Sequence, residues 1–269
     1  MMQKSFTEAD IEACFNNPER DKCFRNFWDS EGGLHWGYFE NLTNARPEDF
    51  LSACHYWNEY MLEHSGITAE SRVLDVACGN GNTAIWLAQQ TGCEVVGVDL
   101  SSIFIDYAQE KASHYPSLRL SFHKESATNL PFPNDSFTHV WSQAALFHIP
   151  KLNKALAEAY RVLGADGIFL FDDLVTPVDE VSETARKYVY DRLLFKPTFS
   201  PKVYADNLSQ LGFTLLQQKD LSQHLEKTYE LVSELAREQY PDTSADFKKT
   251  QEMIAAGEVG WYFYLCKKV

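Results

Sequence analysis

Val73-Leu74-Asp75-Val76-Ala77-Cys78-Gly79-Asn80-Gly81-Asn82-Thr83-Ala84 is the stretch that decides the fold of this 269-residue chain. An apolar strand runs directly into a turn with two glycines, and a helix follows. Because glycine lacks a Cβ, a ligand and the helix N-terminus can both approach such a turn closely. Twenty residues beyond Gly79, Asp99 ends the next apolar strand. A carboxylate at that position can accept hydrogen bonds from both hydroxyls of a ribose, so the pattern predicts a nucleoside site.

Outward from this stretch, short apolar runs alternate with amphipathic stretches of helical length. Such alternation predicts parallel strands with helices on both faces of the sheet. The expected strands are Arg72–Ala77, Glu94–Asp99, Leu118–His123, Thr138–Ser142, Gly167–Asp172, Phe213–Lys219 and Val259–Cys266. The expected helices of the core are Asn82–Gln90, Ser101–Ser113 and Lys151–Leu163. A helical insertion is expected from Thr176 to about Leu194, followed by a helix at Pro201–Leu211. Long helical sequence is expected from Leu221 to about Ala256.

The pattern of strand-like and helical segments divides the chain into four parts. Residues 1–66 are expected to form an N-terminal helical cap and a lid over substrate and cofactor, and residues 67–175 the α/β core. Residues 176–212 are expected to form an inserted helical cap, and residues 213–269 to complete the sheet. We therefore predict an α/β, doubly wound, mostly parallel sheet with helical caps.

Composition limits the possible partners. Twenty-four basic residues against 38 acidic residues give a net charge of −14. A polyanion would be repelled by such a chain, so nucleic acid and anionic membrane surfaces are not expected as partners. No apolar run is long enough to span a bilayer, and residues 1–6 lack the apolar core of a signal peptide, so a cytoplasmic protein is expected.

Two nucleotides are compatible with the glycine turn. Gly79-x-Gly81-x-x-Ala84 satisfies a relaxed dinucleotide fingerprint, which would suit an NAD-linked oxidoreductase. Asp75 stands four positions before Gly79, and its carboxylate would repel a pyrophosphate but favour a cationic amino group. A cofactor with a cationic amino-acid tail fits this turn better.

The segment from Asp75 to Gly81, together with Asp99, resembles motif I and its acidic partner in class I S-adenosylmethionine-dependent methyltransferases. The likeness continues through Leu130–Phe137 and Arg161–Gly167, and so covers residues 72–173. Outside this core the chain is most similar to the glycine, sarcosine and dimethylglycine N-methyltransferase group. That outer likeness rests on Leu34–Tyr38, Val140–Gln143 with His148, and Ala256–Trp261.

The resemblance implies a seven-stranded sheet whose last strand is antiparallel, with S-adenosylmethionine across the carboxyl ends of its strands. Gly79 and Gly81 would approach the methionine part, with Asp75 near its ammonium. Asp99 would hold the ribose, Leu100 would pack on the adenine, and Ser126 and Ala127 would border the adenine ring. Ala77 stands where the family often has glycine. The full set expected to bind cofactor is Asp75, Ala77, Gly79, Asn80, Gly81, Asp99, Leu100, Ser126, Ala127, Trp141 and Ser142.

The activated methyl group needs no protein nucleophile, so the chain has to place a small-molecule acceptor in line with it and exclude water. His148 is the candidate base and Gln143 lies beside it in sequence; a packed or capping histidine is the other interpretation. Aromatic side chains and one acid are available for the acceptor: Trp36, Tyr38, Asp172, Tyr188, Tyr204 and Trp261. Asp172 and Asp173 could in principle ligate magnesium, but no metal is expected.

We therefore expect a methyltransferase that acts on an amine or amino-acid-like molecule. The alternatives are O- or C-methylation of a phenolic, terpenoid or polyketide-like metabolite, an NAD-linked oxidoreductase, and a cofactor-binding module without catalysis. The sequence gives neither the acceptor nor the oligomeric state.

Overall fold

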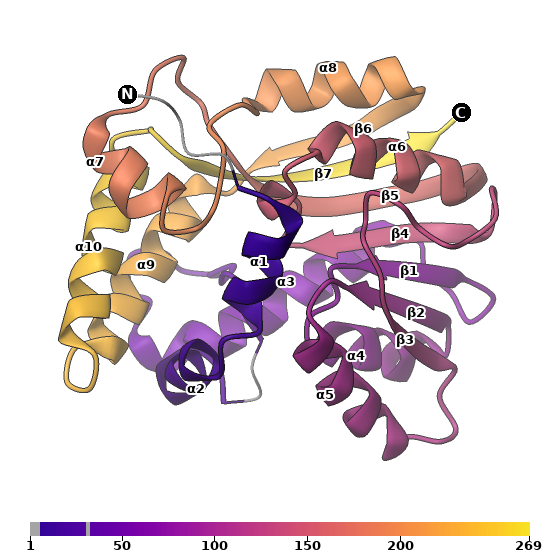
Figure 1. The fold of residues 1–269 in the computed structure, drawn as a ribbon, viewed down its shortest axis with the longest axis horizontal. Helices are drawn as coiled ribbons and strands as arrows, with labels where there is room; N and C mark the ends of the chain where they lie inside the picture. Colours follow the sequence, from indigo (N-terminus) through magenta and orange to yellow (C-terminus); the bar gives the residue numbers. More distant parts are fainter. Residues whose placement is uncertain (1–5, 31–32) are drawn as a thin grey trace.

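The computed structural model describes residues 6–30 and 33–269, and is built on one seven-stranded sheet (Figure 1). Residues 1–5 and 31–32 lie outside the described residues. The strands are β1 (Arg72–Val76), β2 (Glu94–Asp99), β3 (Leu120–Lys124), β4 (Phe137–Gln143), β5 (Leu163–Val175), β6 (Phe213–Asp220) and β7 (Gly260–Lys268). All seven predicted strands are present, with ends that differ by a few residues.

The strand order is β3-β2-β1-β4-β5-β7-β6. The first five of these strands pair in parallel, and β7 runs antiparallel to both of its neighbours. The order reverses between β1 and β4, and ligands of doubly wound sheets bind at the carboxyl ends of the strands beside such a reversal. The predicted α/β fold with a last antiparallel strand is confirmed.

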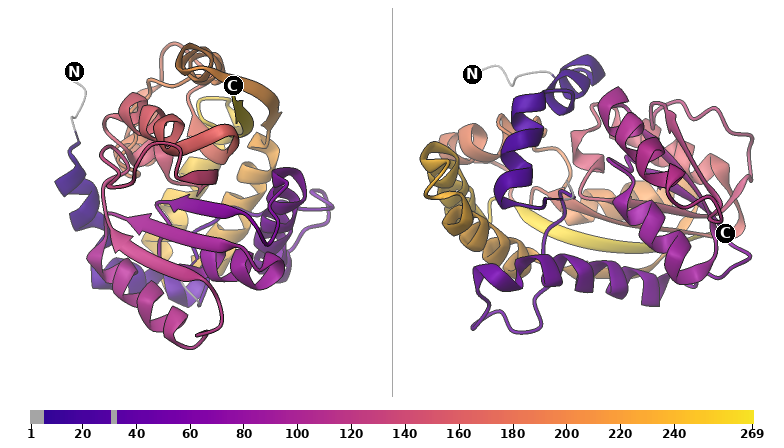
Figure 2. Two further views of the ribbon diagram at one scale, coloured as in Figure 1. Left: turned by 90° about the vertical axis from the view of Figure 1, so that its right-hand side faces the viewer. Right: turned by 90° about the horizontal axis from the view of Figure 1, so that it is seen from below.

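Helices cover both faces of the sheet, because the strands are apolar on both sides. Alternate residues of one strand point to opposite faces: Val73 belongs to one core cluster and Leu74 to the other. The helices of the first face are α3 (Phe50–Ser65), α4 (Asn82–Thr91) and α5 (Ser102–Ser113), and those of the second are α6 (Leu152–Val162) and α8 (Pro201–Leu211). The two turned views in Figure 2 show the sheet between these layers.

The remaining helices gather at one end of the sheet. They are α1 (Glu8–Phe15), α2 (Pro18–Phe27), α7 (Glu183–Ala185), α9 (Ser222–Ala236) and α10 (Pro241–Ala255). Figure 1 shows α1 in front of the carboxyl ends of the strands, with α9 and α10 beside it. Phe27, Tyr229 and Phe247 join α2, α9 and α10 through ring contacts with centroids 5.6–5.8 Å apart. These helices therefore form a wall around the end of the sheet where a ligand is expected.

The segment after β5, expected to be a helical insertion from Thr176 to about Leu194, is helical over only part of that range. Only α7 and a π-helical turn at Arg186–Tyr190 form there. The turn packs inward, with Val189 and Tyr190 buried, and Tyr190 donates a hydrogen bond to the carbonyl of Glu258. Tertiary contacts of these side chains override the periodic sequence pattern, which is common for short helical segments.

Gly81 provides a test of how the β1–α4 turn is held. Its φ is +79°, and a Cβ there would lie 2.8 Å from the Cβ of Ala108. We expect Gly81→Ala to lower the free energy of unfolding by about 2–4 kcal/mol, from left-handed backbone strain plus overpacking. Gly66→Ala is the control, because Gly66 has φ +71° but no atom within 4 Å of a Cβ; about 1–2 kcal/mol is expected there. Denaturant unfolding measures both, and equal losses would contradict the steric role of Gly81.

Candidate nucleoside and acceptor site

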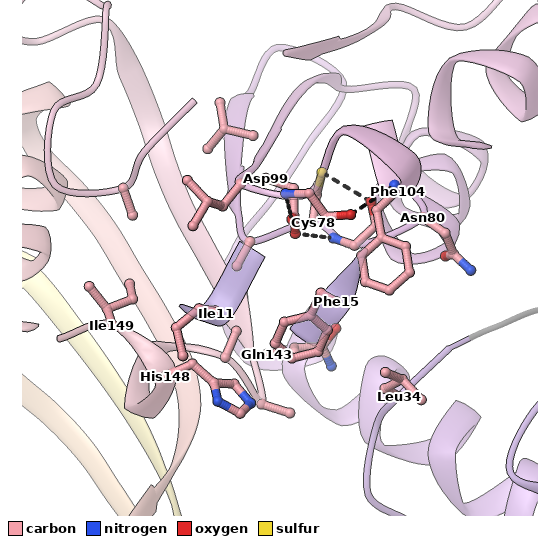
Figure 3. Close-up of a pocket in the computed structure, with 18 of the residues that line it drawn as sticks. Ile11, Phe15, Leu34, Cys78, Asn80, Asp99, Phe104, Gln143, His148 and Ile149 are labelled. Atoms are coloured by element: carbon pink, nitrogen blue, oxygen red, sulfur yellow. Dashed lines mark hydrogen bonds between the residues drawn. The ribbon is translucent and has the colours of Figure 1, made fainter. Parts of the chain in front are cut away.

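A cleft of about 1060 Å³, open to solvent, lies at the carboxyl ends of β1, β2 and β4. Its walls come from the β1–α4 turn, the ends of β2 and β3, the turn after β4, and helix α1 (Figure 3). Predicted site residues that line it are Ala77, Gly79, Asn80, Asp99, Leu100, Ser126, Ala127, Gln143 and His148.

The turn after β1 presents backbone to the cleft. Ala77 and Gly79 both have left-handed backbone, with φ of +59° and +52°. No atom lies within 4 Å of the position of a Cβ on Gly79, so this glycine faces open space. Gly81, by contrast, packs against Ala108 and Phe122 and does not line the cleft. The expected approach of Gly81 to the cofactor is therefore corrected: its missing Cβ lets helix α5 and strand β3 pack closely.

Asp99 is oriented toward the cleft by the two loops beside it. Its Oδ2 accepts a hydrogen bond from the N–H of Gly79 at 2.9 Å, and its Oδ1 accepts one from Ser101 at 2.8 Å. Burial raises the pKa of Asp99, and these backbone donors oppose that effect. Each carboxylate oxygen has a second lone pair, so the residue can still accept from a diol in the cleft.

Asp75 lies under the turn and does not line the cleft itself. It is 3% exposed, and its Oδ2 is buried without a hydrogen-bond partner in the described part of the chain. Burial, with a smaller contribution from the nearby charge of Asp99, raises its pKa to about 7. A buried acceptor without a donor is costly, and a cationic ligand group above the turn would compensate it.

The charge of the cleft walls is one-sided. Among the described residues, four carboxylates line the cleft, those of Glu8, Glu12, Asp99 and Glu125, and no lysine or arginine does. Such a cleft attracts a cation and repels a pyrophosphate. The geometry therefore fits a cationic nucleoside and argues against a dinucleotide.

The end of the cleft beyond β4 carries two hydrogen-bond acceptors. The Oε1 of Gln143 and the Nδ1 of His148 are buried, with no hydrogen-bond partner among the described residues. Figure 3 shows both side chains on the side of the pocket away from Asp99. Burial, assisted by the positive charge of Arg20, lowers the pKa of His148 to about 3. The imidazole is therefore neutral and a weak base, so it is suited to accept a hydrogen bond.

Two residues of β4 that were expected to bind cofactor are not in the cleft. Trp141 is 0% exposed and lies in a hydrophobic core cluster. Ser142 is also fully buried, and its hydroxyl donates to the carbonyl of Val76 at 2.9 Å. Both face the packed interior because β4 is a central strand, so the expectation for them is corrected.

The expected aromatic acceptor pocket is a packed scaffold. Trp261 and Trp57 both donate their indole N–H to Asp172, at 2.7 and 2.8 Å, and Asp172 is 1% exposed. Trp36 is buried with its ring centroid 5.5 Å from that of Trp261, and Tyr38 packs on Trp57. None of these side chains lines the cleft. The structure therefore places these side chains in the packed interior and not at the expected acceptor pocket, because they pack edge-on or tilted against one another.

Tyr204 and Tyr188 also lie away from the cleft. Tyr204 is 0% exposed and hydrogen-bonds to Asp173 in the core under α8. Tyr188 is half-buried in the π-helical turn, and its carbonyl accepts from Arg192 and Thr250. They are structural residues of the described fold, and the expectation that they build the pocket is corrected.

Helix α1 supplies cleft residues that the sequence did not point to. Glu8, Ile11, Glu12 and Phe15 line the cleft from one face of this helix. Their spacing of i, i+3, i+4 and i+7 is a helical face, and Thr7 with Asp10 forms a capping box at its start. The pattern could have predicted the helix, but not which element that face meets.

The strand, the glycine turn, the helix and the strand-end carboxylate define a nucleoside-binding domain of the doubly wound class. Residues 74–171 match the family described as "Methyltransferase domain". Residues 74–171 therefore form a methyltransferase domain, and the fold around it is the one shared by S-adenosylmethionine-dependent methyltransferases. S-adenosylmethionine is therefore its cofactor, and this resolves the choice between that nucleoside and NAD.

Curated relatives act on different acceptors. The chain is 29% identical over 202 residues to methyltransferase GfsG of Streptomyces halstedii, covering 72% of this chain and 70% of that protein. It is 32% identical to sterol 24-C-methyltransferase of Eremothecium gossypii, over 64% of this chain and 48% of that protein. It is 27% identical to glycine/sarcosine/dimethylglycine N-methyltransferase of Actinopolyspora halophila, over 82% of this chain and 38% of that protein. The chain thus spans half or less of the length of the last two.

Solved structures share the fold over nearly the whole chain. A putative sarcosine dimethylglycine methyltransferase from Galdieria sulphuraria superposes with a TM-score of 0.82 at 20% identity, covering 93% of this chain and 98% of that chain. A geranyl diphosphate methyltransferase in complex with GPP and sinefungin gives 0.82 at 17% identity, covering 97% and 99%. At these identities the comparison establishes the fold alone.

The raised pKa of Asp75 predicts a pH-dependent stability. In the unfolded chain this carboxyl has its ordinary pKa of 3.8, whereas the folded value is about 7. Between these values the folded state keeps a proton that the unfolded state has lost, so the free energy of unfolding falls as pH rises. We expect this component to fall by about 1.4 kcal/mol per pH unit from pH 4 to 7 and then to level off.

Asp75→Asn isolates the component, because it keeps the shape of the side chain and removes the titration. Denaturant unfolding at pH 5, 6, 7 and 8 gives the difference between wild type and variant. Relative to the Asp75→Asn variant, the free energy of unfolding of the wild type should fall as pH rises to 7. A difference that does not change with pH would show that Asp75 titrates normally.

Proposed function

We propose that this protein transfers a methyl group from S-adenosylmethionine to the nitrogen of a small amine, with an amino-acid-like acceptor favoured. The observation that carries the proposal is a pair of buried hydrogen-bond acceptors without donors, Gln143 Oε1 and His148 Nδ1, at the far end of the cleft. Two hydrogen-bond acceptors on a buried wall are best satisfied by a ligand that donates two hydrogen bonds. A primary amine has two N–H bonds and one lone pair, so it satisfies both acceptors and leaves the lone pair free.

The chemistry follows from this placement. When bound, the cofactor supplies a methyl group already activated on a cationic sulfonium. Gln143 and His148 would hold the N–H bonds of the acceptor, and so aim its lone pair along the line of displacement. Leu34, Phe15 and Phe104 line the same cleft with apolar surface and would exclude water from the reacting atoms.

Arg20 favours an acceptor that also carries a carboxylate. Its guanidinium carbon lies 4.6 Å from the ring centroid of Phe15, and its charge lowers the pKa of His148. Among the described residues, Arg20 forms no ion pair with a carboxylate. Arg20 does not line the cleft, so it would favour the carboxylate of an amino-acid-like molecule through its charge and not by direct contact.

The alternatives fit these walls less well. Methylation of a hydroxyl benefits from a general base, and His148 with a pKa of about 3 is a weak one. Methylation at carbon leaves the two buried acceptors unsatisfied. The four carboxylates of the cleft would repel a diphosphate. A hydroxyl acceptor remains the second candidate, because it can donate one hydrogen bond.

Assays with purified protein and S-adenosylmethionine test the class of acceptor. Small amino acids with a primary amine should yield S-adenosylhomocysteine and methylated product, and secondary amines should react more slowly because they offer one N–H bond. Tertiary amines, phenols and terpenols should not react. The rate at low acceptor concentration should rise with pH toward the pKa of the acceptor, because only the free amine has a lone pair. Turnover of phenols alone would replace the amine by the hydroxyl candidate.

Removing either acceptor group tests the site. We expect Gln143→Leu and His148→Leu each to lower kcat/KM for the amine by about tenfold or more, because a hydrogen bond that orients the acceptor is lost. The Kd of S-adenosylhomocysteine, measured by calorimetry, should stay within about twofold, since neither residue is needed to hold the nucleoside. Gln90→Leu on the exposed face of α4 is the matched control and should change neither value. Unchanged kcat/KM in both cleft variants would remove the basis of the proposal.

A further inference from the structure

Glu8 reaches from helix α1 to the end of the cleft where β3 stops. Its Oε1 accepts a hydrogen bond from the hydroxyl of Ser126 at 2.9 Å and one from Thr128 at 2.9 Å. These residues are 118 and 120 positions apart from it in sequence, so the contact is a tertiary one. It places a carboxylate beside Ser126 and Ala127, the two residues expected at the adenine ring.

The hydroxyl of Ser126 has no hydrogen left to donate to a ligand, and it is a weaker acceptor than the carboxylate of Glu8. It donates its hydrogen to Glu8, and it accepts from the backbone N–H of Thr128 at 3.1 Å. The hydroxyl of Thr128 also lies 2.8 Å from it. Ser126 therefore serves to position Glu8, and the carboxylate is the strong acceptor at this end of the cleft.

The second oxygen of Glu8 is open to the cleft. Oε2 accepts no hydrogen bond from the described residues, although Glu8 lines the cleft and is half-buried. The neighbouring N–H of Ala127 likewise donates to no described residue. An acceptor next to a donor matches the edge of adenine, where the exocyclic amino group donates and the adjacent ring nitrogen accepts.

Helix α1 is fixed in this position by further polar contacts along its length. One turn later Glu12 pairs with Lys124 at 2.6 Å, and Asn16 accepts from the hydroxyl of Ser101 at 2.7 Å. Ile11 adds the apolar contact and is 7% exposed. The carboxylate is thus held in place before any ligand arrives, which lowers the entropy cost of binding.

We propose that Glu8 is a cofactor-binding residue that selects adenine, by accepting a hydrogen bond from the exocyclic amino group of the base through Oε2. The inference rests on the binding of S-adenosylmethionine in this cleft, but not on the identity of the acceptor. It assigns base recognition to a residue of the N-terminal helix, outside the α/β core that forms the rest of the nucleoside site.

Titration calorimetry with two nucleosides tests it. S-adenosylhomocysteine has an amino group at the position that Glu8 faces, and S-inosylhomocysteine has a carbonyl there, which a carboxylate repels. Wild type should prefer the adenine compound. We expect Glu8→Gln to weaken binding of S-adenosylhomocysteine about tenfold, because a charge-assisted hydrogen bond becomes a neutral one or is lost. The amide of the variant can donate to the carbonyl, so the preference between the two nucleosides should fall by tenfold or more.

Two further variants separate base recognition from docking of the helix. Ser126→Ala with Thr128→Val removes the donors that hold Glu8 but keeps its carboxylate; it should weaken both nucleosides similarly. Glu12→Gln removes one charge from the same helix face, from a carboxylate already paired with Lys124. It should leave the ratio of the two affinities unchanged. Circular dichroism confirms that each variant is folded.

The outcomes are distinct. A loss of preference confined to Glu8→Gln supports the inference. Equal weakening of both nucleosides in Glu8→Gln would show that Glu8 only docks the helix, and unchanged binding would show no role at all; either result overturns the inference and leaves the proposed function intact. Failure of the wild type to bind S-adenosylhomocysteine would overturn both.

Discussion

The site depends on the position of two carboxylates, Asp75 and Asp99, at the carboxyl ends of neighbouring parallel strands. Strand pairing places them one strand apart, with Asp75 opposite Gly97 in the register. Asp75 is buried and Asp99 is half-buried at the cleft, and burial raises the pKa of each. Such an arrangement is unfavourable in the empty protein and becomes favourable when a cationic ligand arrives. In the expected site, the fold places two carboxyl groups where a cationic cofactor would favour their ionised form.

Glycine at two positions makes this arrangement possible, for different reasons. Gly79 leaves room for the ligand, whereas Gly81 leaves room for Ala108 and Phe122 of the neighbouring elements. Ala77 accepts left-handed backbone with φ +59° at the first position of the same turn, although it has a Cβ. A strained backbone of this kind persists only where the surrounding structure fixes it. Here the N–H of Cys78 bonds to the carbonyl of Val98 at 3.0 Å and fixes the turn to β2.

The sheet and the nucleoside end of the site could be predicted from local sequence. Each strand is a short apolar run, and the turn and Asp99 lie within 27 residues of the chain, so their proximity follows from one strand–helix–strand unit. The acceptor end could not be predicted in this way. Trp36 and Trp261 look available in sequence, yet their rings pack edge to face on each other and the indole N–H of Trp261 donates to Asp172. Which aromatic faces remain free depends on tertiary packing between segments more than 200 residues apart.

The contacts of helix α1 with the cleft also could not be predicted from local sequence. Their arrangement suggests how this helix links the two ends of the site. Its single face spans the cleft: Glu8 stands at the adenine end, and Phe15, two turns later, stands over His148 with ring centroids 5.1 Å apart. A helix is rigid over two turns, so contacts at one end fix the position of the other. A nucleoside that engages Glu8 would therefore reinforce the existing contact of Phe15 with His148, and so strengthen the apolar wall around the methyl acceptor. Because displacement at the methyl group requires a dry site, this coupling would favour the order in which cofactor binds before acceptor.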